Sequence, residues 1–374
     1  MTTLPDYSQA ETWIEFLEYV SRSPEDSQSE LSKFAYSKFE MTGDSTWTIP
    51  IAFSQWKLKR YIEALEILEK GIDIKLINVE YNVILGMVAR KIPGKETFAK
   101  QAYFQALKID PDRADVYYNL GNLVREDEPE LAEKAYRKSL LIDNTAHLTW
   151  HNLGLALNDQ QNHDQALKAF RQGIVLEPNY SDGWCNAGLA LFGMDQFSRA
   201  IQYFRYTIEV DENSEAGYVN LGNALMNELR PLEALECLRK GYEISSGSVN
   251  AIWNLSLIEL MLGNFKKGWD LYEARFKTEQ FQDLVYPTTG PNVENIDELP
   301  SEGQTPVVIW SEQGMGDAIQ FCRYLYLFEE KKIPFVFVAR ESLFTLMKDW
   351  LPYADKVVLE KTWDPKEDKR SKIA

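Results

Sequence analysis

The sequence predicts a mainly α protein, in which a superhelical solenoid of paired α-helices is followed by a small α/β module. Small residues recur about every 34 positions in the middle of the chain. A stretch rich in turn-forming residues follows, and strand-like and helix-like runs then alternate up to the end. These observations divide the chain into capping helices over 1–43, a solenoid of about seven repeats over 44–277, a linker over 278–304 and the α/β module over 305–374.

Three positions define the repeat: a small residue, a second small residue about twelve positions later, and a large apolar residue four positions after that. The first small residues are Ala52, Gly86, Gly121, Gly154, Gly188, Gly222 and Ser256. The second are Ala64, Ala99, Ala132, Ala166, Ala200, Ala234 and Gly268, and the large residues are Leu68, Tyr103, Tyr136, Phe170, Phe204, Leu238 and Tyr272. This spacing indicates two helices per repeat that cross closely at the small residues, stacked side by side. We expect each large residue to fill the gap toward the next repeat.

The stretch TWHNLGLALNDQQNHDQALKAFRQGIVLEPN, residues 149–179, carries the whole pattern. It resembles the tetratricopeptide repeat (TPR), and the resemblance extends over roughly residues 44–277. It implies a superhelix in which the first helix of each repeat lines a concave groove. Residues 8–41 contain two further amphipathic stretches, which we interpret as a capping pair of helices.

An asparagine stands two positions before the first small residue in five consecutive repeats: Asn119, Asn152, Asn186, Asn220 and Asn254. A side-chain amide both donates and accepts hydrogen bonds, so such a ladder can hold a peptide backbone without reading its sequence. The ladder resembles the one in the repeat superhelix of the O-linked N-acetylglucosamine transferases, which implies a peptide or protein partner. The alternative is that these asparagines only bond to neighbouring helices. Further groove candidates are Tyr118, Asn122, Arg125, His151, Asn158, Asn223 and Trp253.

The composition excludes several classes of function. The formal net charge of −17 opposes binding to nucleic acid. No apolar run is long enough to span a membrane, and the N-terminus does not read as a secretory signal. The three cysteines are far apart in the sequence, which favours a reducing, cytoplasmic location. His147 and His151 share a helix face but have no evident third ligand, so we expect no metal and no cofactor.

The last region predicts strands at TPVVIW, PFVFVAR and KVVLE, with helices at DAIQFCRYLYLFEE and ESLFTLMKDWL between them. This alternation is typical of parallel strands in a Rossmann-like sheet. The turn after the first predicted strand reads WSEQGMGDAIQFCRY, residues 310–324. Gly314 and Gly316 permit a tight turn, and Asp317 can cap the following helix. GxGD alone is a weak signal, and it is not the dinucleotide fingerprint GxGxxG.

A repeat array that ends in GNFKKGWDLYEARF and is followed by SEQGMGDAIQFCRYLYLF resembles a family of bacterial repeat proteins. Their C-terminal region is like the heptosyltransferases and the O-linked N-acetylglucosamine transferases. The resemblance implies that Asp317 is a general base toward an acceptor, with Glu312, Gln313, Gly314, Gly316 and Arg340 around the acceptor turn. In that family a second Rossmann-like domain binds the nucleotide sugar. The chain ends at Ala374 after three predicted strands, so a nucleotide sugar is expected only with a second domain.

Three functions follow from these patterns. The first is a scaffold that binds an extended peptide or partner protein in the groove and carries a truncated glycosyltransferase-like module. The second is an inverting, metal-independent sugar transferase that acts on protein or glycan, with its donor-binding half supplied elsewhere. In the third, the α/β piece only caps the C-terminal end of the solenoid. We expect the chain alone not to be an enzyme.

Overall fold

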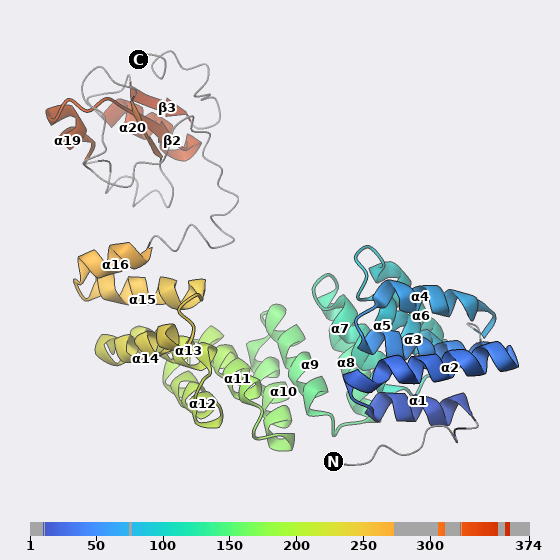
Figure 1. Cartoon of the computed structure of the whole chain (residues 1–374). Coiled ribbons are helices and arrows are strands. Elements are labelled where there is room, and N and C mark those ends of the chain that lie inside the picture. The colour runs from blue at the N-terminus through green and yellow to red at the C-terminus, as the bar shows by residue number, and fades with distance from the viewer. Residues whose placement is uncertain are drawn as a thin grey trace. The chain divides into compact units, whose positions relative to one another are not determined.

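A computed structural model describes residues 10, 12–74, 77–272, 306–310, 322, 324–350 and 356–359. The chain divides into two compact units, Met1–Arg275 and Phe276–Ala374. The helices of the first unit are α1 (Trp13–Arg22), α2 (Gln28–Thr42), α3 (Thr48–Lys57), α4 (Tyr61–Lys70), α5 (Val79–Ala89), α6 (Glu96–Ile109), α7 (Ala114–Val124), α8 (Pro129–Ile142), α9 (His147–Asp159), α10 (His163–Leu176), α11 (Ser181–Gly193), α12 (Phe197–Val210), α13 (Glu215–Asn227), α14 (Pro231–Ile244), α15 (Val249–Met261) and α16 (Phe265–Tyr272) (Figure 1). Three short 3₁₀ turns, Glu25–Ser27, Ser45–Trp47 and Ile72–Ile74, connect some of them.

From α3 onward, each odd-numbered helix packs against the even-numbered helix that follows it, and each pair packs against the next pair. The turn inside most pairs contains one residue in the left-handed region of backbone space. These residues are Lys59, Gly94, Gln161, Asp195, Leu229 and Gly263, with φ between 57° and 83°. A left-handed residue ends a helix by redirecting the chain, so this turn repeats along with the helices.

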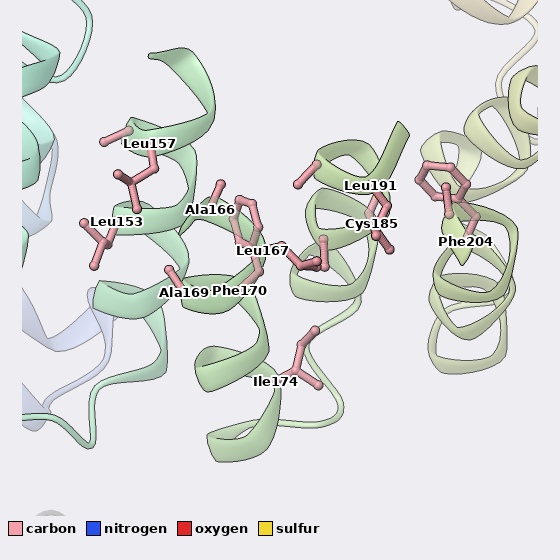
Figure 2. Packing of buried hydrophobic residues seen from close by; sticks show 14 of the residues in the cluster. Leu153, Leu157, Ala166, Leu167, Ala169, Phe170, Ile174, Cys185, Leu191 and Phe204 are labelled. Atoms are coloured by element: carbon pink, nitrogen blue, oxygen red, sulfur yellow. The ribbon is translucent and has the colours of Figure 1, made fainter. Parts of the chain in front are cut away.

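The core of the array is built around the small residues that define the repeat. A Cβ added at Gly86, Gly121, Gly154 or Gly188 would approach a ring carbon of Tyr103, Tyr136, Phe170 or Phe204 to 2.4–2.5 Å. Each ring therefore lies on the glycine of its own repeat, and these four rings are buried. This differs from the expectation that the large residue fills the gap toward the next repeat. Figure 2 shows the rings of Phe170 and Phe204 among the buried aliphatic side chains of the same core.

Two N-terminal helices extend the array, since α1 and α2 both pack against α3. The ring of Phe16 lies 5.1 Å from that of Phe34 and 5.7 Å from that of Trp47, measured between centroids. Lys57 Nζ donates to the backbone oxygens of Val20 (2.9 Å) and Ser23 (3.0 Å) at the end of α1. A cation placed at the last carbonyls of a helix stabilises its C-terminus.

The second unit contains a three-stranded parallel sheet in the order β1 (Val307–Trp310), β2 (Phe335–Ala339) and β3 (Val357–Leu359). Helix α19 (Leu325–Glu330) lies between β1 and β2 in the sequence, and α20 (Glu341–Trp350) lies between β2 and β3. The predicted strands are thus present with somewhat shorter bounds. The predicted helix 317–330 begins outside the described residues, apart from its end in α19. Leu325, Leu343 and Met347 are buried in one cluster with Phe335 and Phe337 of β2, so α19 and α20 cover the same face of the sheet.

Candidate functional site

The predicted ladder is distributed over five odd-numbered helices: Asn119 on α7, Asn152 on α9, Asn186 on α11, Asn220 on α13 and Asn254 on α15. All five side chains are half-buried. Helices α9, α11, α13 and α15 contact one another in succession more closely than α8, α10, α12 and α14 do. The odd-numbered helices therefore lie on the inner side of the stacked array. We call these five residues the ladder, and the helix surface that they occupy the ladder face.

Two ladder amides bond within their own helix. Asn186 Nδ2 donates to the backbone oxygen of Asp182 at 3.0 Å, and Asn254 Nδ2 donates to that of Asn250 at 2.9 Å. Because a backbone carbonyl accepts only, each of these contacts identifies the amino group of the side chain. The amide orientation is thereby fixed, and Oδ1 is the atom left for another partner.

Two other ladder amides connect neighbouring repeats. Asn152 Nδ2 donates to Asn122 Oδ1 at 2.7 Å, and Asn220 Nδ2 lies 3.4 Å from Cys185 Sγ. The hydroxyl of Tyr136 donates to the same oxygen of Asn122 at 2.7 Å. Burial raises the pKa of Tyr136, which keeps its hydroxyl protonated and able to donate. The alternative role of the ladder, bonding between helices, therefore applies to part of it.

The Oδ1 atoms remain available along the ladder. Within the described part of the chain none of the five accepts a hydrogen bond, and none is among the buried polar atoms that lack a partner. These oxygens are therefore in contact with solvent. The ladder presents a row of acceptors whose amino groups are mostly held by the protein itself.

The sequence predicted that His151 lies on the surface of the groove, but the structure buries it. Its side chain is 6% exposed and its Nδ1 is buried without a hydrogen-bond partner. The ring lies 5.5 Å from that of Phe170 and meets the ring of Tyr180 edge-on at 5.0 Å. Burial lowers the pKa of His151 to about 4, so the imidazole is neutral at pH 7. Phe170 of α10 and Tyr180 of the loop before α11 thus both cover this ring.

Two further groove candidates are occupied by contacts to other side chains. Arg125 Nη1 lies 3.6 Å from Asp159 Oδ2. Asn158 Oδ1 lies 2.7 Å from His163 Nδ1. Both contacts involve residues of α9 or its flanking turns, so they fix the spacing of α7, α9 and α10.

The remaining candidates are half-buried side chains on the odd-numbered helices. The hydroxyl of Tyr118 lies 3.4 Å from Asn152 Nδ2, beside the ladder. Asn223 follows the ladder residue of α13 by three positions. Trp253 stacks on Tyr272 of α16 with ring centroids 5.0 Å apart, so it is held in the last helix pair.

Comparison with known proteins identifies the repeat. Residues 147–180, which span α9 and α10, match the family model of the tetratricopeptide repeat. This helix pair is a tetratricopeptide repeat, and the array as a whole has a TPR-like arrangement. No curated protein sequence matches the chain.

Several solved structures are similar to parts of the chain, and one of them, with a TM-score above 0.5, supports the fold of the TPR array. The C-terminal part of a TPR repeat-containing protein from Cytophaga hutchinsonii is similar with a TM-score of 0.52 and 17% identity, over 65% of this chain and 99% of that one. pilF of Pseudomonas aeruginosa has a TM-score of 0.47 and 21% identity, over 55% of this chain and 95% of that one. YrrB, described as a TPR protein with an unusual peptide-binding site, has a TM-score of 0.39 and 22% identity. The match covers 50% of this chain and 95% of that one.

Most of the predicted acceptor turn lies outside the described residues, namely Glu312, Gln313, Gly314, Gly316 and Asp317. Arg340 is described. It directly follows β2, and its backbone oxygen accepts from the amides of Leu343 and Phe344 at 2.9 Å each, which starts α20. Arg340 therefore stands at the carboxyl end of a parallel strand, where open α/β sheets bind ligands.

A buried carboxylate in the last helix pair of the array was not predicted from the sequence. Glu259 of α15 is fully buried and receives Arg239 Nη2 (2.9 Å), Lys267 Nζ (2.8 Å) and Asn264 Nδ2 (2.7 Å). Its position corresponds to Leu225 in the preceding repeat, which is buried and apolar. Glu259 could have been predicted from the sequence, because it is a charged residue at a position that is apolar in the preceding repeat.

The residues that the structure describes include neither a candidate membrane span nor a candidate metal cluster. No helix there is long and apolar enough to cross a membrane. No cluster of three or more histidine, cysteine, aspartate or glutamate side chains there is arranged to hold a metal ion.

Proposed function

We propose that the protein is a TPR scaffold that binds an extended peptide segment of a partner protein along the ladder face. The observation that carries this proposal is the row of solvent-accessible Oδ1 atoms on Asn119, Asn152, Asn186, Asn220 and Asn254. A backbone N–H of the peptide is the donor that such a row accepts, whatever the sequence of the peptide.

The spacing of the helices fits an extended ligand. Packed helices lie about 10 Å apart, and an extended chain advances about 3.3 Å per residue. One ladder oxygen therefore meets about every third residue of the peptide. The amino groups that are already bonded hold Asn152, Asn186 and Asn254 in place, so little side-chain entropy is lost on binding.

The experiment begins with selection of 12-residue peptides from a displayed library on the full chain. The affinity of a selected peptide is then measured by fluorescence anisotropy for the wild type and for a triple variant with Asn152→Ala, Asn186→Ala and Asn220→Ala. Each lost hydrogen bond is worth about 1 kcal/mol. Together they should therefore weaken binding at least about tenfold.

A matched control replaces three exposed asparagines in the loops of the same region, with Asn144→Ala, Asn179→Ala and Asn213→Ala. The chemical change is identical, but these side chains lie off the ladder face, so affinity should not change. Equal affinity of the ladder variant and the wild type removes the ladder from the mechanism.

A second proposal, sugar transfer by residues 305–374, is supported by the parallel order of β1, β2 and β3 and by Arg340 at the end of β2. The donor-binding half would come from another domain or chain. The test of sugar transfer incubates the protein and a selected peptide with uridine- and adenosine-diphosphate sugars. The mixtures are prepared with and without cell extract, which is the source of the donor-binding half. Nucleotide release that depends on Asp317 supports transfer. Release that is the same for Asp317→Asn, or absent from every mixture, contradicts it.

A further inference from the structure

Charge is sorted between the inner and outer helices of the TPR array. Helices α7, α9, α11, α13 and α15 contain no lysine or arginine. Each of the helices between them, α8, α10, α12 and α14, carries two or three. The helical cations of this part of the chain are therefore on the outer helices, whereas Arg113, Arg125 and Arg230 lie in the turns.

The acidic residues of the ladder face lie at one end of it. Residues four before or seven after a ladder asparagine share its side of the helix. At those positions stand Asp115, Asp159 and Asp182, all exposed, on α7, α9 and α11. The exposed Glu126 follows in the turn after α7.

The other end of the ladder face is neutral. The corresponding positions of α13 and α15 hold Ala216, Asn227, Asn250 and Met261, which are all exposed. The face thus has a direction along the array, acidic over α7–α11 and uncharged over α13–α15.

Two of the acidic side chains have no basic partner. Asp115 pairs with Arg113 at 2.8 Å, and Asp159 lies 3.6 Å from Arg125. Asp182 and Glu126 make no ion pair with any lysine or arginine that the structure describes. Asp182 instead hydrogen-bonds with Tyr180. Carboxylates without a cationic partner on one face attract cationic ligands and repel anionic ones.

We propose that the segment bound on the ladder face is rich in lysine or arginine where it crosses α7, α9 and α11, and uncharged where it crosses α13 and α15. This inference rests on the proposed function, because the ladder oxygens hold the backbone while the carboxylates select its side chains. An acidic segment would find Arg113 and Arg125 already paired with Asp115 and Asp159. Its carboxylates would be repelled by Asp182 and Glu126.

Three labelled 12-residue peptides test the charge preference. They share one alanine-based sequence and differ only in whether every third residue is lysine, glutamine or glutamate. Anisotropy with the full chain in 50 mM salt should show the lysine peptide binding at least about tenfold more tightly than the glutamine peptide, with no binding of the glutamate peptide. Raising the salt to 500 mM should remove most of the difference, because exposed charges are screened over about 5 Å or less at that concentration.

A charge-neutralised variant locates the preference. The double variant Asp182→Asn with Glu126→Gln should weaken binding of the lysine peptide several-fold. The affinity for the glutamine peptide should not change. The control is Glu209→Gln with Glu236→Gln, which changes the net charge equally on exposed residues of α12 and α14. It should leave both affinities as they are.

The outcomes separate the two claims. Equal binding of the lysine and glutamate peptides, or an equal loss in the control variant, overturns the charge preference. If at the same time the asparagine-to-alanine ladder variant still binds the glutamine peptide more weakly than the wild type does, the proposed function stands. Only the charge preference then fails. If no selected or designed peptide depends on the ladder, both fail.

Discussion

The ring of Phe170 lies directly on Gly154, so that a Cβ added to this glycine would stand 2.5 Å from the ring carbon Cε1. Phe170 is 1% exposed and has no room to move away. Alanine favours a helix over glycine by about 1 kcal/mol, but overpacking a core costs about 1–3 kcal/mol. A contact this short makes overpacking the larger effect. Gly154→Ala should therefore lower the free energy of unfolding in urea by about 2 kcal/mol.

The control is Gly247→Ala, since nothing lies within 4 Å of a Cβ at that position. It should leave stability unchanged within about 0.5 kcal/mol. A Phe170→Leu change in the Gly154→Ala background should recover part of the loss, because Ala52 and Leu68 occupy the same positions in an earlier repeat. Additive effects of the two changes would contradict the contact.

Leu229 provides a prediction at the turn between α13 and α14. It has a φ of 57° and its side chain is 87% exposed. The left-handed conformation costs a residue with a Cβ about 1 kcal/mol, and the leucine side chain gains little from packing. Leu229→Gly should therefore raise the midpoint of thermal unfolding by a few degrees. Gly263→Ala, at the corresponding turn with a φ of 83°, should lower it. A loss of stability in Leu229→Gly would show that the strain is absent.

The sequence predicted the repeat well because its period is carried by local residue types. The sequence alone shows a glycine about every 34 residues, with an aromatic residue about sixteen positions later. The contact of Gly154 with Phe170 confirms that the two helices of the repeat meet there. The turn at Leu229 was not predictable, since nothing in leucine favours a positive φ. There the packing of the helix pair imposes the conformation on the residue.

The candidate site was predictable in position but not in detail. The spacing places Asn186 and Asn254 on odd-numbered helices, yet only the coordinates show which carbonyl each amide reaches. His151 occupies the next position along its helix from a ladder residue and is nevertheless buried, because Tyr180 of a different loop packs against it. Contacts between repeats of this kind depend on tertiary structure, which the period alone does not specify.

Burial of His151 predicts a pH dependence of stability. Burial is the main cause that lowers the pKa of His151 to about 4, aided by Arg125 and His147 and opposed by Asp182. The unfolded state, with an ordinary histidine pKa near 6.5, binds the proton more readily. The neutral, buried His151 therefore stabilises the folded state fully above about pH 6.5, and this stabilisation is lost as the pH falls toward about 4. The loss in the free energy of unfolding is about 2 kcal/mol between pH 7 and pH 5. Urea unfolding should show this slope in the wild type and in His163→Gln, and a smaller one in His151→Leu. An unchanged slope in His151→Leu would assign it to other groups.

Glu259 predicts a second, more acidic transition. Burial opposes the ionisation of Glu259, but hydrogen bonds from Lys267, Arg239 and Asn264 outweigh it and lower its pKa. A lowered carboxyl pKa stabilises the folded state above the pKa of the unfolded chain, and the stabilisation is lost as the pH falls through the folded value. Urea unfolding below pH 4.5 should therefore show a larger loss of stability in the wild type than in Glu259→Leu.

The same position distinguishes charge from packing. Glu259→Ala removes the carboxylate and leaves a cavity, so it should cost about 3 kcal/mol at pH 7. Glu259→Leu restores the residue type of Leu225 in the preceding repeat, and Arg239 and Lys267 are about half exposed and can turn to water. It should therefore be close to neutral at pH 7, since well-packed apolar residues replace buried ion pairs at little cost. If Glu259→Leu is as unstable as Glu259→Ala, the ion cluster itself holds α14, α15 and α16 together.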